Sequence, residues 1–191
     1  MPPKPRITRE LILEAAFALA REQGIGAVSA RSIAERLGCS TQPVLYHFTR
    51  VEEVRSEVYR MADEMHSAYL MQLAPEQNPM LSIGLNYIRF ATEEKPLFRL
   101  LFQSDGLGGG SVAALADVPE LSGVMEVLGQ ESGLTEKQCR RVFRALLMLV
   151  HGWASFLANN SMVYVEGEIA PMLELAFDGL VGAMMREETD G

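Results

Sequence analysis

The segment that most constrains this chain is residues 29–48, with the sequence SARSIAERLGCSTQPVLYHF. It predicts two short helices, residues 31–37 and 41–48, joined by a tight turn. Ser29 and Ser40 stand at N-cap positions, where a side-chain oxygen accepts a free backbone N–H. This order of elements is the helix-turn-helix pattern, whose second helix enters the DNA major groove.

The same segment contains the apolar and small residues that such a pair of helices needs. Ile33, Leu37 and Val44 are spaced to face a shared core. Ala34 and Gly38 are small at the positions where the two helices approach each other, and Gly38 permits the left-handed conformation that ends a helix.

Charge separates this region from the rest of the chain. The net charge is −8, yet residues 1–50 contain seven Lys and Arg against four Glu, while residues 51–191 contain ten against twenty-one acidic residues. A basic N-terminal part on an acidic body is typical of a protein that touches phosphates with one part only.

Apolar periodicity predicts helices along the whole chain and no strand, so the expected class is all-α with about nine helices. Residues 9–23 are expected to form the first helix, and a helix at 51–73, about 33 Å long, joins the helix-turn-helix DNA-binding domain (1–50) to a separate C-terminal body (51–191). The remaining helices are expected near 79–94, 96–103, 119–131, 136–158 and 168–187. The Gly-rich stretch 104–111 predicts a loop, because no strand precedes it as a phosphate-binding loop requires.

Several classes of protein are disfavoured by the sequence. No apolar run reaches about 18 residues without a charge, and the N-terminus lacks the apolar core of a signal peptide, so a cytoplasmic protein is expected. Two cysteines fit that compartment; Cys39 is either a small core residue or a redox switch. No Ser-His-Asp grouping or pair of catalytic carboxylates is found, and His66 and His151 lack metal-ligand spacing. We therefore expect no enzyme activity, no metal and no cofactor.

The second helix of the motif carries the candidates for base contacts. Thr41 and Gln42 stand at its N-terminal end, and a glutamine amide can form a bidentate pair with adenine. Pro43 and the Thr41 methyl group can pack on a thymine methyl. The alternative for Thr41 and Gln42 is a polar surface turn.

Four further side chains are candidates for phosphate contacts. Tyr46 and His47 end the second helix and offer a hydroxyl and an imidazole N–H, with partial core burial as the alternative. Arg31 and Arg50 flank the motif and can contact a phosphate or a guanine. The full set expected to contact DNA is Ser29, Arg31, Ser40, Thr41, Gln42, Pro43, Tyr46, His47 and Arg50.

The N-terminal 55 residues resemble the tetracycline-repressor (TetR) family of bacterial transcription regulators. The resemblance rests on residues 12–16 (ILEAA), Gly24, residues 29–38 (SARSIAERLG), residues 45–48 (LYHF) and residues 52–54 (EEV). It implies a dimer that places two recognition helices in successive major grooves of a palindromic operator, and a ligand pocket in the C-terminal body. In the body, EKPLFRLLF and HGWA are similar to segments of one subgroup of these regulators.

Two positions depart from the family pattern. Leu45 stands where most members have a tyrosine, and Val51 stands where a phosphate-binding lysine is common. Tyr46 and Arg50 are the candidates to replace those contacts.

The last two helices carry apolar residues around most of their circumference, so each must bury more than one side. Packing a pair from each subunit into a four-helix bundle would do this, with Gly152 and Gly179 allowing close approach. We therefore expect a homodimer through residues 136–158 and 168–187, with a monomeric core as the alternative.

Aromatic and soft side chains of the body favour an apolar ligand, although ordinary core packing is the alternative for each of them, and His151 can equally be a core histidine bonded to a neighbour. The pocket candidates are Tyr69, Tyr87, Phe90, Phe98, Phe102, Met148, His151 and Trp153.

These observations predict a ligand-responsive DNA-binding regulator, a repressor released from a palindromic operator by a small apolar or amphipathic molecule. The alternative is an all-helical protein-interaction module with a degenerate DNA-contacting helix.

Overall fold

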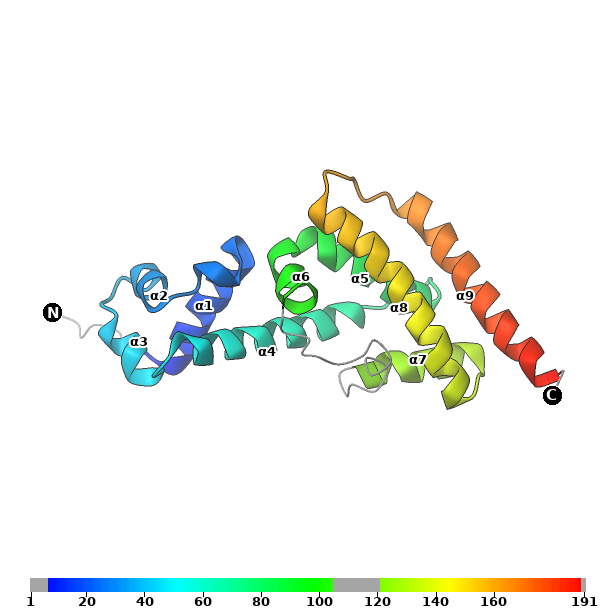
Figure 1. The fold of residues 1–191 in the computed structure, drawn as a ribbon, viewed down its shortest axis with the longest axis horizontal. Coiled ribbons are helices and arrows are strands. Elements are labelled where there is room, and N and C mark those ends of the chain that lie inside the picture. The colour runs from blue at the N-terminus through cyan, green and yellow to red at the C-terminus, as the bar shows by residue number, and fades with distance from the viewer. Residues whose placement is uncertain (1–6, 105–120, 190–191) are drawn as a thin grey trace. The chain divides into compact units, whose positions relative to one another are not determined.

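The structure, a computed structural model, describes residues 7–104 and 121–189. These residues form nine α-helices and no strand (Figure 1), which confirms the all-α prediction. The predicted loop at 104–111 lies outside the described residues from position 105 onward.

The described residues divide into two compact units, each with its own packing. The first joins residues 7–65 to 94–104. It contains α1 (Arg9–Gln23), a 3-10 turn (Ile25–Ala27), α2 (Ala30–Arg36), α3 (Gln42–His47), most of α4 (Val51–Leu70) and α6 (Lys95–Phe102). Its core side chains include Ile12, Ala16, Val28, Ile33, Val44, Val58 and Leu97.

The second unit joins residues 66–93 to 121–189. It contains the end of α4, α5 (Pro79–Glu93), α7 (Ser122–Ser132), α8 (Glu136–Asn159) and α9 (Glu166–Thr189). Helix α5 packs along α8 and also contacts α7 and α9. The fully buried side chains of this second unit include Leu85, Ile88, Phe90, Leu128, Leu157 and Ile169.

Helix α6 packs on α1 in the first unit, although the sequence analysis assigned residues 95–102 to the C-terminal domain. The predicted division at residue 50 separates two functions, whereas the compact units describe only which residues pack together. The division therefore stays a prediction.

Side-chain caps explain several helix starts. The Thr8 hydroxyl accepts from the Leu11 N–H at 3.3 Å at the start of α1. At the start of α5, the Asn78 amide oxygen accepts from the backbone N–H of Leu81 at 3.1 Å. Both residues use an oxygen to satisfy donors that a helix N-terminus leaves free.

Helix α4 is shorter than predicted and ends at Leu70 instead of residue 73. The Asn86 side-chain amide donates to the carbonyls of Leu70, at 3.2 Å, and Gln72, at 2.9 Å. These bonds satisfy carbonyls that another helical turn would have used, so a residue of α5 fixes the end of α4.

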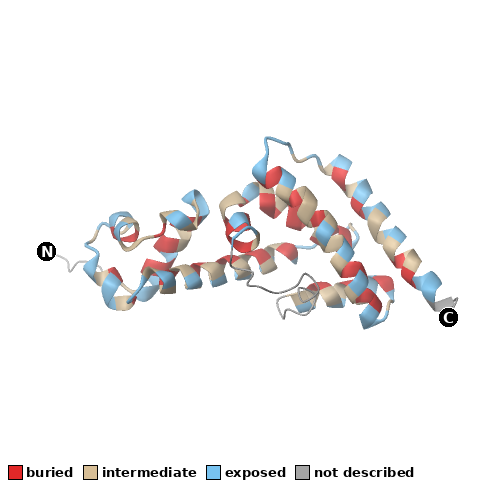
Figure 2. Ribbon diagram, viewed as in Figure 1, coloured by how far each residue is buried: buried red, intermediate tan, exposed pale blue. Residues whose placement is uncertain are grey.

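Burial along α4 follows a stripe of every fourth residue, which is shown in Figure 2 as regularly spaced buried positions. The stripe consists of Val54, Val58, Ala62, His66 and Leu70. Its spacing is that of one helix face, and it includes a histidine that the apolar pattern of the sequence passed over.

By length and composition alone, α8 is apolar enough to cross a membrane, and 33% of its most apolar window is buried. It contacts α5, α7 and α9, as a helix inside a helical bundle does. Packing against these helices accounts for the apolar residues on one side of α8. The opposite side is exposed and carries Met148 and Phe156.

Candidate functional site

Helix α2 begins with a reciprocal cap made by two serines. The Ser32 backbone N–H donates to the Ser29 hydroxyl at 3.1 Å, and the Ser29 N–H donates to the Ser32 hydroxyl at 3.0 Å. The Ser32 hydroxyl also donates to the Ala27 carbonyl at 2.7 Å. The predicted cap at Ser29 is thus confirmed, and it fixes the start of α2 to the turn before it.

The turn between α2 and α3 depends on Gly38, whose φ of 63° lies in the left-handed region. There the Cys39 N–H donates to the Ala34 carbonyl at 2.9 Å, which ends α2. The predicted cap at Ser40 is wrong: the N-cap of α3 is Thr41, whose side chain makes no capping hydrogen bond. The hydroxyls of Ser40 and Thr41 are both exposed.

Helix α3 has one buried face and one exposed face. Val44, together with Phe48 just after the helix, is buried against the first unit. On the other face Gln42 is exposed, Leu45 is 56% exposed and Tyr46 is 83% exposed. Residues three and four apart share a helix face, so these three side chains form one surface. The exposure of Tyr46 excludes the alternative that it belongs to the core.

The other predicted contact residues border this surface in different ways. Arg31 is exposed and makes no ion pair within the part of the chain that the structure describes. Arg50 is 3.7 Å from Glu53, with its side chain 75% exposed. The His47 ring is half-buried, and its Nε2 lies 3.2 Å from the Ile7 carbonyl oxygen. One ring nitrogen of His47 therefore holds the segment before α1, which leaves only the other for a phosphate.

Two cationic side chains that the sequence analysis did not single out, Arg9 and Arg55, connect the helix-turn-helix to neighbouring elements. Arg9 lies over the Phe48 ring, 4.9 Å from its centroid, and pairs with Glu57 of α4 at 2.5 Å. Arg55 of α4 donates to the Val28 carbonyl at 3.0 Å. These contacts join the first turns of α4 to the helix-turn-helix, and their partners lie too far apart in sequence for a local pattern to indicate them.

Helix α6 is tied to α1 by a bidentate ion pair. The Arg21 guanidinium donates to both carboxylate oxygens of Glu94, with Nε 2.7 Å from Oε2. Hydrogen bonding to the carboxylate raises the pKa of Arg21 further. The pair links the end of α1 to the start of α6 within the first unit.

In the second unit, four of the eight pocket candidates form an aromatic cluster with His66. The Phe90 ring lies 4.9 Å from that of His66 and 5.5 Å from that of Tyr69. Next to it, the Tyr87 hydroxyl is 3.0 Å from His151 Nδ1. The Ser155 hydroxyl is 3.2 Å from His151 Nε2, so a polar chain runs through otherwise apolar surroundings.

Burial favours the neutral form of three ionisable groups in this cluster. Burial lowers the pKa of His66 to about 4, and also lowers the pKa of His151. Burial raises the pKa of Tyr87. Desolvation disfavours the charged form in all three cases, so the cluster offers hydrogen bonds without net charge.

The remaining pocket candidates lie elsewhere. Phe98 and Phe102 belong to α6 in the first unit, with ring centroids 5.1 Å apart. Met148 is exposed on α8, and Trp153 is half-buried. Among the described residues, no group of three or more His, Cys, Asp or Glu is placed to hold a metal ion.

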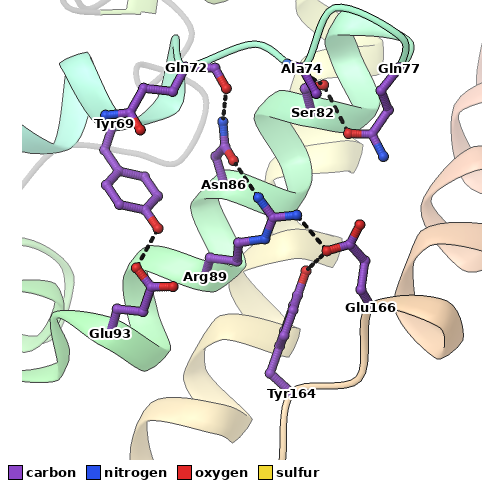
Figure 3. A network of polar contacts seen from close by, with 10 residues as sticks. All are labelled: Tyr69, Gln72, Ala74, Gln77, Ser82, Asn86, Arg89, Glu93, Tyr164 and Glu166. Carbon is purple, nitrogen blue, oxygen red and sulfur yellow. Dashed lines mark hydrogen bonds and ion pairs between the residues drawn. The ribbon is translucent and has the colours of Figure 1, made fainter.

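Polar contacts link three parts of the second unit (Figure 3). Tyr69, near the end of α4, donates to Glu93 of α5 at 2.6 Å. Arg89 of α5 donates to Asn86 Oδ1 at 3.3 Å and pairs with Glu166 at the start of α9. The Tyr164 hydroxyl also donates to Glu166, at 3.2 Å. The network therefore ties the end of α4 to α5, and α5 to the segment before α9.

Helices α2 and α3, joined by the turn at Gly38 and with one face of α3 exposed, have the arrangement of a DNA-binding helix-turn-helix. Residues 12–58 match the family described as "Bacterial regulatory proteins, tetR family". This match confirms the resemblance of the N-terminal segment to the TetR family of transcription regulators.

Comparison with solved structures gives the fold of the whole chain. A crystal structure of a TetR variant from Acinetobacter baumannii AYE in complex with minocycline is 15% identical to this chain, covers 94% of it and 97% of its own length, and gives a TM-score of 0.55. At this identity the likeness concerns the fold alone. No curated protein matches the chain in a sequence comparison.

Proposed function

We propose that this protein is a ligand-responsive repressor that binds a palindromic operator as a homodimer. The observation that carries the proposal is the exposed face of α3: Gln42, Leu45 and Tyr46 point away from a helix whose other face is buried. A helix of this kind presents an amide to base edges and leaves nearby cations for phosphates.

The proposed base contact is Gln42 with adenine, supported by Thr41 and Pro43 at the same end of α3. The proposed phosphate contacts are Arg31, Arg50 and the Tyr46 hydroxyl. Ser29, Ser40 and the free nitrogen of His47 complete the interface. Arg50 needs only to leave Glu53, from which it is 3.7 Å away, to reach a phosphate.

For the effector we propose a small neutral molecule that is apolar or amphipathic, bound at the aromatic cluster of the second unit. The cluster combines aromatic rings with the Tyr87–His151–Ser155 chain, which supplies polar groups without charge. The minocycline-bound TetR variant, which shares the fold, also carries a small molecule. Binding would release the operator by displacing α4, whose end Asn86 and Tyr69 tie to α5.

For the dimer we propose the exposed faces of α8 and α9. Phe156 is 61% exposed and Leu175 is 75% exposed. A side chain at Gly152 or Gly179 would meet nothing within 4 Å, so each helix has room for a close neighbour. Exposed apolar side chains over two adjacent helices mark an interaction surface, and a second copy would bury both stripes at once.

Fluorescence anisotropy with duplex DNA from upstream of the protein's own gene tests the function. The wild type is expected to bind this duplex more tightly than a shuffled duplex. Gln42→Ala is expected to lose about 5- to 150-fold in affinity for each half-site of the specific duplex, since a bidentate base contact is worth about 1–3 kcal/mol. Equal affinity for both duplexes would refute operator binding.

The salt dependence of DNA binding tests the proposed contact between Arg50 and a phosphate. Arg50→Ala is expected to lower affinity for both duplexes alike and to reduce the slope of log affinity against log salt by about two, one for each subunit of the dimer. Arg36→Ala is the matched control, because Arg36 pairs with Glu22 on the surface between α1 and α2. An unchanged slope in Arg50→Ala would remove Arg50 from the interface.

A further inference from the structure

Leu45 is an apolar side chain on the one surface of α3 that the proposed function places in the DNA groove. It is 56% exposed, while Val44 beside it is buried. It lies on the same helix face as Gln42, three residues earlier, and Tyr46 is also exposed there. An isolated exposed leucine is ordinary on a protein surface, but on this face its apolar contact would be made with DNA.

We propose that Leu45 contacts the methyl group of a thymine in the major groove, about one base pair from the base that Gln42 contacts. The inference rests on the proposed function, because it requires a specific operator. It assigns a specificity-determining role to the position where the chain departs from the tyrosine common in its family.

The chemistry of base edges identifies the thymine. A leucine side chain has no donor or acceptor, so it cannot distinguish bases by hydrogen bonding. Thymine alone presents a methyl group in the major groove. Burying that methyl against Leu45 removes apolar surface of both partners from water, which favours thymine over the other bases.

The spacing along α3 places this contact next to the glutamine contact. Three residues advance about 4.5 Å along a helix axis, and successive base pairs are about 3.4 Å apart. A side chain one turn after Gln42 therefore reaches a neighbouring base pair. Each half-site should contain an adenine contacted by Gln42 and, one step away, a thymine contacted by Leu45.

The test uses the full-length protein and does not require a known operator. Binding duplexes are first selected from a random double-stranded library, and the enriched site is then resynthesised with uracil replacing each thymine in turn, in both half-sites together. Uracil pairs as thymine does and lacks only the methyl. At the Leu45 position we expect about fourfold weaker binding for each half-site, and about 15-fold for the pair, from the burial of one methyl.

The same substitution is then measured with Leu45→Ala. We expect this variant to bind the thymine and uracil duplexes alike at that position, so that the two changes are not additive. Leu45→Gln, which is polar and of similar length, is a second variant with the same expectation. Leu73→Ala is the matched control, because Leu73 is another exposed leucine, and the wild-type penalty should persist in it.

Two results overturn the inference while leaving operator binding intact: no uracil substitution weakens wild-type binding, or every penalty persists in both Leu45 variants. If the library yields no enriched sequence, the proposed function itself fails, and the inference fails with it.

Discussion

The bidentate pair between Arg21 and Glu94 gives a quantitative prediction about what holds α6 on α1. The Arg21 side chain is 50% exposed, but that of Glu94 is only 10% exposed. Arg21→Ala would remove two charge-assisted hydrogen bonds and leave a nearly buried carboxylate without its cation. We expect a loss of about 2–3 kcal/mol in the free energy of unfolding, the cost of removing a hydrogen-bond partner from a charged group. This is below the 3–5 kcal/mol or so for a fully buried pair, because water can reach the half-exposed site.

The opposite replacement should cost less. Glu94→Gln removes the charge on the buried side and leaves a guanidinium that is already half in water, so we expect a loss of about 1 kcal/mol. The control is Arg36→Ala, because the Arg36–Glu22 pair is also bidentate but has side-chain exposures of 35% and 52%. Exposed pairs contribute little to stability because water screens them, so Arg36→Ala should have the smallest effect of the three.

Urea unfolding at one fixed protein concentration measures all three variants, with the m-value checked for change. The expected order of destabilisation is Arg21→Ala, then Glu94→Gln, then Arg36→Ala. An Arg21→Ala loss no larger than that of Arg36→Ala would show that burial of Glu94 does not govern the pair, and Glu94→Gln as the most damaging change would refute the asymmetry.

Three further predictions concern the second unit. Between pH 6.5 and about 4, His66 takes up a proton in the unfolded chain but not in the folded protein, where it is buried. The free energy of unfolding should therefore fall as the pH falls, by up to about 1.4 kcal/mol per pH unit. In urea titrations across that range, His66→Phe should show a weaker dependence of this free energy on pH, and an unchanged dependence would contradict the prediction. Leu175→Glu should convert the proposed dimer to a monomer in light scattering, whereas Leu73→Glu should not; a Leu175→Glu variant that is still dimeric would exclude this face of α9 from the interface. Asn86→Ala should destabilise the protein by about 2–3 kcal/mol in urea unfolding, because two carbonyls at the end of α4 lose their donor; a loss below about 0.5 kcal/mol would show that water replaces the amide.

Local patterns predicted the elements well, because caps and helix periodicity are encoded by neighbours in sequence. Ser29 caps α2 at the predicted position, and Thr8 and Asn78 make caps of the same local kind at the starts of α1 and α5. The helix-turn-helix followed from small and apolar residues spaced within 20 positions, so its two faces were predictable before any tertiary contact was known.

The structure differs from the sequence-based prediction where a side chain far away in the sequence determines the local structure. Helix α4 stops early because Asn86, sixteen residues after Leu70, satisfies the carbonyls at its end. Ser40 gives up the cap because α3 begins one residue later than predicted. The buried stripe of α4 includes His66, which an apolar pattern would count as polar, because burial keeps this ring neutral.

The candidate DNA interface was more predictable than the effector site for the same reason. Every residue of the DNA-contacting surface lies within one short segment, and helix geometry alone orders its exposed side chains. The aromatic cluster instead contains Tyr69, Tyr87 and His151, which come from three different helices. Phe98 is not part of it because α6 packs in the other unit, and only the tertiary structure shows this. A pattern of aromatic residues along a sequence cannot make that separation.

The chain crosses between the two units at α4 and again between α5 and α6, within the described residues. At the second crossing two adjacent carboxylates face different partners: Glu93 accepts from Tyr69 in the second unit, and Glu94 pairs with Arg21 in the first. A displacement of α5 by a ligand at the cluster would therefore act directly on the residue next to the tie that holds α6 on α1.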